Sequence, residues 1–394
     1  MSLSVSAPAK VILFGEHAVV YGQPAIAVAV DLRCYFDVTA KHHVNNTGSL
    51  CIYLRDLSET VVRLSKPADE YLGALLTSSE ELLEKAWAMV SNTLYNSNPS
   101  IPKSTISRSV CICFYLLLRS LQIARSCTFP SSRAVLRCDL HTHIEVHSDI
   151  PVGAGLGSSA AFSVAAATTF LILSGCLSME SDFTPDRQQC DLIQSLAHEA
   201  EAIIHGKPSG LDTAVSVHGG GVYFKRHTST PVLHRIPIPS EDWNILIVNS
   251  NVGRSTGEVV QAVADRRRRQ TTAVDDLLQK IGDLSRKAFD VFNGSEVCLA
   301  KLTPLIRKNQ QLLVNLDVSC LAVDEIISEL CRFGLTAKLT GAGRGGCVIA
   351  VALNSCGYEQ ALQLMQNKSL WAKVVRGFAV GVHVLRTFPR PSAS

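Results

Sequence analysis

The sequence predicts an α+β protein with two domains. Strand-like and helix-like segments follow one another without the regular repeat of a parallel α/β fold. With 394 residues, the chain exceeds the size at which one hydrophobic core usually stops growing. Residues 227–241 contain three prolines and mark the expected boundary, with an N-terminal domain at 1–230 and a C-terminal domain at 231–394.

The N-terminal half is expected to begin with strands. The run VSAPAKVILFGEHAVVYGQPAIAVAV predicts two β segments separated by a glycine-bounded turn, and residues 34–65 predict further strands. The alternating run VLRCDLHTHIEVHSDIP predicts a strand that leads into a glycine-rich loop. Apolar spacing and stop signals predict helices at 80–94, 105–121, 158–173 and 186–204.

The C-terminal half mixes strands and helices again. NILIVNSN predicts a strand, and residues 256–292 and 301–333 predict two helical regions. AKLTGAGRGGCVIAVAL then reads as a strand, a glycine loop and a second strand. A helix and one final strand are expected to close the chain.

Composition favours a compact cytoplasmic protein. Hydrophobic residues make up 47% of the chain and charged residues 18%, and the net charge of +3 is too small to indicate nucleic-acid binding. The thirteen cysteines have no paired spacing, which favours reduced thiols. Residues 152–179 lack charge, but their Ala, Ser, Thr and Gly content favours a buried helix over a membrane span. We therefore expect a soluble protein without a membrane segment.

The run PVGAGLGSS at residues 151–159 is the most informative part of the chain. A glycine-dense turn that opens into a helix gathers unpaired N–H groups and the positive end of the helix dipole, which suits a phosphate. The run lacks the Lys-Ser/Thr pair of a Walker A loop and the later acidic residue of a dinucleotide fold. A tight turn before a buried helix remains the alternative interpretation.

Three glycine-containing segments occur in order: APAKVILFGEH, PVGAGLGSSAAFS and KLTGAGRGGC. They resemble the three motifs of the galactokinase–homoserine kinase–mevalonate kinase–phosphomevalonate kinase superfamily, and the resemblance covers nearly the whole chain. Within that superfamily, GEHAVVYGQPAIA and HGKPSGLDTAVS look like the mevalonate kinases. The resemblance implies a two-domain small-molecule kinase fold with the active site in the interdomain cleft.

The resemblance also implies that ATP and Mg²⁺ bind at the central motif. Phosphoryl transfer needs positioning and cationic stabilisation, and Mg²⁺ prefers hard oxygen ligands. The positions that match nucleotide contacts of the family are Lys10, Ser148, Gly153, Ala154, Gly155, Leu156, Gly157, Ser158 and Ser159. Ser159 and Glu201 match its two metal ligands. Glu199 is expected to point elsewhere and to be a solvated surface charge, because residues two apart on a helix face different directions.

Asp212 and Lys10 match the catalytic residues of the family. Asp212, in PSGLD, is the candidate base or hydroxyl-orienting group, and a Lys10 ammonium beside it would keep the carboxylate ionised. Each also has a structural alternative. PSGLD suits a helix-capping Asp, and Lys10 stands at the beginning of an apolar strand, where a surface lysine is common.

The acceptor implied by the resemblance is (R)-mevalonate. Glu16, His17, Thr256 and Ala342 match positions that family members place around it. A lone histidine is more often structural, so the role of His17 rests on the motif alone. Arg254 could pair with the substrate carboxylate, and a surface arginine is an equal alternative.

The chain departs from the family pattern at two places. Arg344 interrupts the glycines of the third motif; at a position with positive φ it costs about 1 kcal/mol or more, and it could crowd the site or bring a cation toward the phosphates. Residues 45–105 match poorly, so the expected adenine contact has no assigned residue.

Two further runs suggest a metal site and a nucleic-acid site, but each is better explained as an ordinary surface of the fold. HTHIEVH places His141, His143, Glu145 and His147 on one strand face. Alternate residues of a strand lie about 6–7 Å apart, which is too wide for one zinc ion. The run Arg266–Arg269 is expected to be a solvated helix face beside nearby aspartates.

The resemblance carried by these motifs implies an ATP- and Mg²⁺-dependent kinase that phosphorylates the primary hydroxyl of (R)-mevalonate to 5-phosphomevalonate, an early step of isoprenoid and sterol biosynthesis. The resemblance also implies a homodimer and feedback inhibition by prenyl diphosphates at the ATP site. Two alternatives stay open from the sequence. One is a sibling kinase that acts on phosphomevalonate or another alcohol, and the other is a catalytically silent binding paralogue.

Overall fold

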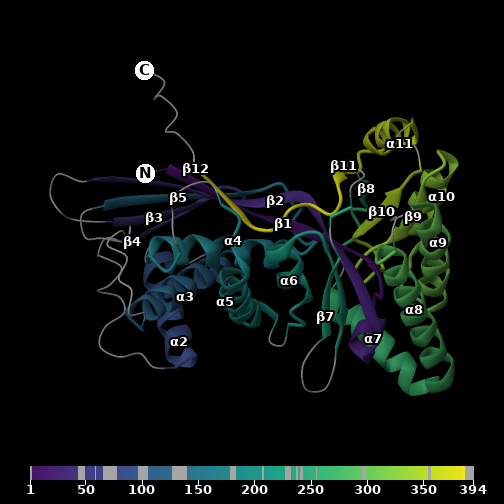
Figure 1. Ribbon diagram of the computed structural model, residues 1–394, viewed down its shortest axis with the longest axis horizontal. Coiled ribbons are helices and arrows are strands. Elements are labelled where there is room, and N and C mark those ends of the chain that lie inside the picture. Colours follow the sequence, from purple (N-terminus) through teal and green to yellow (C-terminus); the bar gives the residue numbers. More distant parts are fainter. Residues whose placement is uncertain are drawn as a thin grey trace.

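The chain forms two sheets that lie at opposite ends of an elongated molecule, each with helices on one side (Figure 1). The larger sheet has five helices beneath it, and the smaller sheet is flanked by the C-terminal helices. The computed structural model describes residues 2–42, 49–57, 59–64, 78–95, 105–126, 140–177, 183–205, 208–226, 232–236, 238–239, 243–253, 255–294, 299–353 and 356–386.

The larger sheet has the strand order β12-β1-β2-β5-β3-β4, and β6 pairs with β2 and β7. All its pairs are antiparallel except β3 with β5. Its strands are β1 (Ser2–Phe14), β2 (Pro24–His42), β3 (Ser49–Leu54), β4 (Thr60–Leu64), β5 (Leu140–Ser148), β6 (Gly221–Lys225), β7 (Val232–Ile236) and β12 (His383–Arg386).

Five helices cover one face of this sheet (Figure 1). They are α2 (Ser79–Val90), α3 (Thr105–Ser126), α4 (Ser158–Leu173), α5 (Arg187–His205) and α6 (Leu211–His218). Two short helical segments also occur. The 3₁₀ helix η1 (Ala18–Tyr21) lies against α8 and β2, and the π-helix η2 (Ser91–Tyr95) follows α2. The helix α4 lies directly against β1 and β2, and it therefore places the glycine loop under the centre of the sheet.

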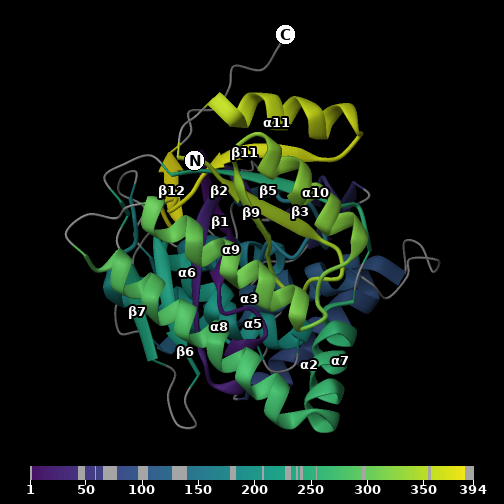
Figure 2. The same cartoon turned by 90° about the vertical axis from the view of Figure 1, so that its right-hand side faces the viewer.

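The smaller sheet has the antiparallel order β11-β8-β10-β9. Figure 2 shows helix α9 crossing in front of this sheet, with α8 packed beside α9 and α11 along the upper edge of the sheet. The strands are β8 (Asn244–Asn249), β9 (Thr336–Leu339), β10 (Cys347–Val351) and β11 (Ala372–Arg376). The helices are α7 (Thr256–Arg269), α8 (Thr271–Phe292), α9 (Leu299–Asn315), α10 (Leu321–Arg332) and α11 (Cys356–Asn367).

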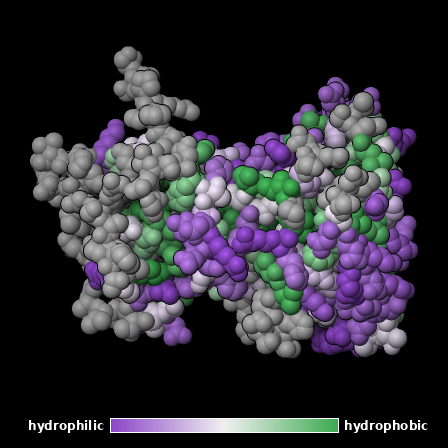
Figure 3. Space-filling model, in the orientation of Figure 1, coloured by the Kyte–Doolittle hydropathy of each residue, from purple (hydrophilic) through white to green (hydrophobic). Residues whose placement is uncertain are grey.

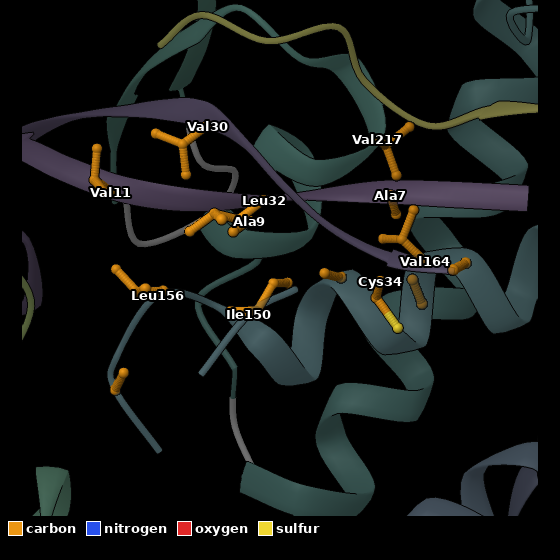
Figure 4. Close-up of a cluster of buried hydrophobic side chains, with 14 of the residues drawn as sticks. Ala7, Ala9, Val11, Val30, Leu32, Cys34, Ile150, Leu156, Val164 and Val217 are labelled. Atoms are coloured by element: carbon orange, nitrogen blue, oxygen red, sulfur yellow. The ribbon is translucent and has the colours of Figure 1, made fainter. Parts of the chain in front are cut away.

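One hydrophobic core continues from the larger sheet to the smaller one. Near its centre, Val11 and Val30 of the sheet face Leu156, which lies within the glycine loop, and Ile150, which precedes it (Figure 4). Thirteen of the sixteen residues of α4 are buried, so this helix has no solvent-facing stripe. The prediction of a helix at 158–173, buried on all sides, is confirmed.

Several element predictions need correction. Residues 34–42 are not a separate strand; they continue β2 because β5 extends its pairing as far as His42. The helical regions at 256–292 and 301–333 are each two helices, with breaks at Gln270 and at 316–320. Two strands follow α11 rather than one, and the second of them, β12, pairs with β1.

The predicted domain boundary after residue 230 stays a prediction. The pairing of the strands nevertheless places β7 and β12, which both follow that residue, in the larger sheet. The larger sheet therefore takes strands from the C-terminal part of the chain as well as from residues 1–230.

The helix α3 is long and apolar enough to cross a bilayer by length and composition alone. Sixty-seven per cent of its apolar window is buried inside the fold, where it packs against α2, α4 and α5. A mostly buried core helix passes the same test. The apolar run Val110–Leu118 forms the buried centre of this 22-residue helix.

The surface over α7 and α8 is mostly hydrophilic (Figure 3). The arginine run at the end of α7 bonds within the protein: Arg267 pairs with Asp275, and Arg268 pairs with Asp265. The Arg267 guanidinium also lies 4.9 Å from the ring centre of Tyr21 in η1. This contact joins the helical pair α7–α8 to the turn that follows β1.

Candidate active site

The glycine loop opens into α4 as the sequence predicts. Gly153, Gly155 and Gly157 have φ values of 72°, 81° and 74°, a region that favours glycine. Gly157 occupies the N-cap position of α4 without a side-chain cap, so the first-turn N–H groups have no partner within the helix. These donors and the positive end of the helix dipole suit an anion.

Lys10 lies across this helix mouth. Its backbone N–H donates to the carbonyl of Leu156 at 2.9 Å. A Cβ atom on Gly157 would lie 2.9 Å from the Lys10 Cγ, so the lysine stem occupies the space that a side chain at 157 would need. Glycine at 157 therefore serves both the backbone conformation and the path of the Lys10 side chain.

Lys10 and Asp212 form an ion pair. The Lys10 Nζ lies 3.1 Å from the Asp212 Oδ1, and the two side chains are 8% and 38% exposed. The N-cap of α6 is Gly210, with φ 82°, and Asp212 is the second residue of the helix. Asp212 is therefore not the capping residue, and its carboxylate faces the lysine at the mouth of α4.

Ser159 and Glu201 are brought together by the packing of α4 on α5. Ser159 Oγ and Ser163 Oγ each donate to the Glu201 carboxylate at 3.2 Å. Glu201 is 4% exposed. Burial, and then the charge of Asp212, raise the pKa of Glu201 to about 7, while the two serines and Lys10 act against that rise.

A magnesium ion fits this donor set. Mg²⁺ takes hard oxygen ligands, usually one or two protein groups together with substrate phosphates. Ser159 and Glu201 supply a hydroxyl and a carboxylate beside the anion-binding helix mouth, and a cation there would offset the repulsion between Glu201 and Asp212. Among the described residues, three or more His, Cys, Asp or Glu side chains never gather in a metal-binding arrangement, the HTHIEVH strand included.

Glu199 differs from the expectation of a solvated surface charge. Its carboxylate accepts from the Tyr115 hydroxyl at 2.7 Å and from the Arg119 Nε at 3.1 Å. The packing of α3 beside α5 provides both partners. Glu199 thus joins two helices and does not take part in the Ser159–Glu201 cluster.

Ser148 lies at the end of β5, just before the glycine loop. Its Oγ accepts from the backbone N–H of Ile150 at 3.1 Å, and its own N–H donates to the Asp56 Oδ2 at 2.6 Å. Sequence reasoning missed Asp56. The parallel pairing of β3 with β5 is what brings it here, as the bond from Arg55 N–H to the Val146 carbonyl shows.

Glu16 and His17 follow the end of β1. The Glu16 side chain has no exposed surface and pairs with Lys338. His17 has φ 61°, and its Nε2 donates to the Ala342 carbonyl at 2.7 Å, because a carbonyl oxygen only accepts. The structure thus brings His17 and Ala342 together. The acceptor role expected of Glu16 stays a prediction.

Thr256 begins α7 and is exposed, after the N-cap residue Ser255. Its role at the acceptor stays a prediction. Arg254, the candidate partner of a substrate carboxylate, lies outside the described residues.

Arg344 does adopt positive φ, at 51°. Its side chain turns to the segment between α9 and α10, where Nη2 lies 2.7 Å from the Asp317 Oδ2 and Nε donates to the Asp317 carbonyl at 3.0 Å. The preceding residue, Gly343, has no room for a side chain, because a Cβ there would lie 2.0 Å from the Val318 carbonyl oxygen. The guanidinium is therefore held by Asp317.

Known proteins match the chain in both halves. The GHMP kinases N terminal domain matches residues 125–220, and the GHMP kinases C terminal domain matches residues 296–365. The mevalonate kinase of Schizosaccharomyces pombe is 31% identical over 378 residues, which cover 91% of this chain and 85% of that protein. The chain belongs to the mevalonate kinase family.

Other members agree with this assignment. The mevalonate kinase of Bos taurus is 32% identical over 394 residues, with 91% of each chain covered. The crystal structure of the Methanococcus jannaschii mevalonate kinase superposes with a TM-score of 0.67 at 25% identity, and covers 95% of this chain and 97% of that one. The predicted α+β kinase fold and the predicted enzyme class, an ATP-dependent small-molecule kinase, are confirmed by this membership.

Proposed function

We propose that this member of the mevalonate kinase family transfers the γ-phosphate of ATP to the primary hydroxyl of (R)-mevalonate and gives 5-phosphomevalonate and ADP, at an early step of isoprenoid and sterol biosynthesis. The observation that carries the proposal is the Lys10–Asp212 pair at the mouth of α4, 3.1 Å between charged atoms. The relatives named mevalonate kinase support the choice of acceptor.

The helix mouth is suited to hold the triphosphate. The glycine loop leads into the first turn of α4, whose N–H groups have no partner within the helix, and residues 153, 155 and 157 carry no side chain that would obstruct an anion. Lys10 adds a nearly buried positive charge beside them. Donors that are fixed before the reaction stabilise the charge that develops during transfer without reorganisation.

Asp212 is the proton acceptor in this proposal. It takes the proton of the acceptor hydroxyl, the hydroxyl oxygen forms its bond to the γ-phosphorus, and the bond between that phosphorus and the bridging oxygen of ADP breaks. Lys10 places its ammonium beside the Asp212 carboxylate, where its positive charge faces both that carboxylate and the phosphates. The pair thereby serves both the alcohol and the phosphates.

Mg²⁺ is proposed to bind between Ser159 and Glu201. When bound with ATP, the ion neutralises charge on the phosphates. The two side chains support this assignment because their oxygens lie together and Glu201 is buried beside a second carboxylate. Calorimetry of nucleotide binding with and without Mg²⁺, on the wild type and on Glu201→Gln, tests it.

The acceptor is tested by an ADP-release assay with ATP, Mg²⁺ and (R)-mevalonate, run in parallel with galactose, homoserine and phosphomevalonate. We expect turnover with mevalonate only, and ³¹P NMR should show a new phosphate monoester. Turnover with another alcohol would replace the proposed acceptor. ATP binding without turnover on any of the four would instead support a silent binding protein.

Three accompanying properties are also proposed. Prenyl diphosphates compete with ATP, because their diphosphate is the kind of anion that the α4 mouth binds; inhibition that ATP relieves tests this.

The chain forms a homodimer, to be tested by sedimentation equilibrium. It works in the cytoplasm, which suits the free thiols of the cysteines that the structure describes, and cell fractionation tests it.

A further inference from the structure

A fully buried ion pair joins the two sheets behind the proposed acceptor site. Glu16 follows β1 of the larger sheet, and Lys338 belongs to β9 of the smaller sheet. Both side chains are 0% exposed, and the Lys338 Nζ contacts the Glu16 Oε1. A buried charge pair with this degree of burial is costly unless its remaining hydrogen-bonding capacity is satisfied.

The remaining capacity is satisfied on both partners. The Lys338 ammonium also donates to the Leu339 carbonyl at 2.6 Å and to the Ile12 carbonyl at 3.4 Å. The other Glu16 oxygen accepts from the Asn309 Nδ2 of α9 at 3.0 Å. Burial lowers the pKa of Lys338, and the Glu16 carboxylate opposes that change. Three elements far apart in the chain therefore meet at one buried pair.

Asn309 donates to Glu16 although this orientation leaves its own amide oxygen unpaired within the described part of the chain. Its side chain is completely buried, and its Oδ1 has no hydrogen-bond partner among the residues that the structure describes. An orphaned buried acceptor destabilises a fold. The amide nonetheless directs its nitrogen to Glu16, because the carboxylate needs a donor there.

Both ends of the pair continue into the proposed acceptor site. The residue after Glu16 is His17. The strand that carries Lys338 ends at Leu339, and the loop that follows it carries Ala342, whose carbonyl accepts from the His17 ring at 2.7 Å. Between them, the Ile12 N–H donates to the Thr340 Oγ1 at 2.9 Å. The ion pair and the His17–Ala342 bond are therefore two ties between the same two segments.

We infer that Lys338 is a positioning residue for the acceptor pocket: through Glu16 it fixes the turn that carries His17 against the third glycine loop. The inference rests on the proposed function, because that function makes His17 and Ala342 acceptor contacts. Lys338 itself touches no substrate in this account. It acts through the carboxylate of Glu16.

Two variants separate positioning from simple stability. Lys338→Met keeps the length of the side chain and leaves the Glu16 charge buried without its partner, which destabilises the fold. Adding Glu16→Gln to Lys338→Met removes both charges, so the thermal midpoint should return most of the way to wild type. The tie between the two segments is still missing, so the acceptor KM should stay raised.

Steady-state kinetics and nucleotide titration make the first test, with Lys368→Met as the matched control at the half-exposed Lys368–Glu329 pair. We expect the double variant to raise the acceptor KM about ten-fold, with the ATP dissociation constant within about two-fold of wild type. The control should change neither. If Lys338→Met does not fold, the double variant carries the test. An unchanged acceptor KM in the double variant overturns the inference.

A substrate-free measurement separates this inference from the acceptor assignment. NMR of ¹³C- and ¹⁵N-labelled histidine, with His17→Asn for assignment, reports whether the His17 Nε2 carries its proton and donates. We expect this signature in the wild type and its loss in the double variant, whichever alcohol the enzyme accepts. An unchanged His17 signature in the double variant contradicts the inference, and absent mevalonate turnover contradicts only the proposed function.

Discussion

The Lys10 Nζ and the Asp212 Oδ1 lie 3.1 Å apart at the mouth of α4, one supplied by β1 and the other by α6. Lys10 is almost fully buried, whereas Asp212 is more than a third exposed. The pair therefore has one side fixed in the fold and one side open to a substrate. The predictions below follow from this geometry and from the carboxylate of Glu201 beside it.

Glu201→Gln should change how stability depends on pH. Burial and Asp212 raise the pKa of Glu201 from 4.5 in the unfolded chain to about 7 in the folded one, so the folded state binds its proton more tightly. Protonation thus stabilises the fold, and this contribution is present below pH 4.5 and lost as the pH rises through 7.

The Glu201→Gln variant has an amide that does not ionise, so it does not lose stability in this way as the pH rises. At pH 8 the Glu201→Gln chain should therefore be more stable than wild type by on the order of 2–3 kcal/mol, and the difference should shrink toward pH 5. Urea unfolding at both pH values measures this. Glu199→Gln is the control, and it should instead lower stability at both pH values because Arg119 and Tyr115 lose their partner. A pH-independent difference for Glu201→Gln would contradict the account.

Gly157→Ala should lower both stability and turnover. The φ of 74° strains any side chain, and the new Cβ would meet the Lys10 Cγ at 2.9 Å. We expect a loss of about 1–2 kcal/mol in the free energy of unfolding and a fall of kcat of about ten-fold or more. Gly334→Ala has similar backbone strain, with φ 77°, in open space, so it controls for strain alone. Equal kcat values for the two variants would contradict the role given to position 157.

Arg344 should be strained but not catalytic. Only glycine relieves a positive φ, so Arg344→Gly should be more stable than Arg344→Ala by about 1 kcal/mol in denaturant unfolding. Both variants lose the exposed pair with Asp317, so the comparison cancels that contribution. Because the guanidinium turns to Asp317, kcat should change by less than about three-fold in both. A large fall in kcat would place the arginine in the reaction.

The sequence was most informative where one local pattern decides the structure. The three glycines at 153–157 and the uncharged run after them predict both the anion loop and the first and last residues of α4. Lys10, Ser159, Glu201 and Asp212 could be chosen only by resemblance to a family. No spacing along the chain says that β1, α4, α5 and α6 meet at one place.

Reasoning from the sequence failed for residues whose surroundings are set by contacts with distant parts of the chain. Glu16 stands in a motif that suggested a substrate contact, and its burial depends on Lys338, which is distant in sequence. Asp56 joins the site only because β3 pairs in parallel with β5. Glu199 appeared solvated from its helix position, but α3 supplies its partners. In each case the deciding neighbour comes from another element.

The measurement that tests the central claim most directly is the turnover and ATP affinity of Asp212→Asn. The amide keeps the size of the side chain but removes the proton-accepting charge beside Lys10, so kcat with mevalonate should fall by about 10²–10⁴-fold. The ATP dissociation constant should stay within about three-fold of wild type, because the phosphates are held by α4. Asp276→Asn, at the exposed Lys280–Asp276 pair, serves as the control. A kcat for Asp212→Asn that matches the control would contradict the account.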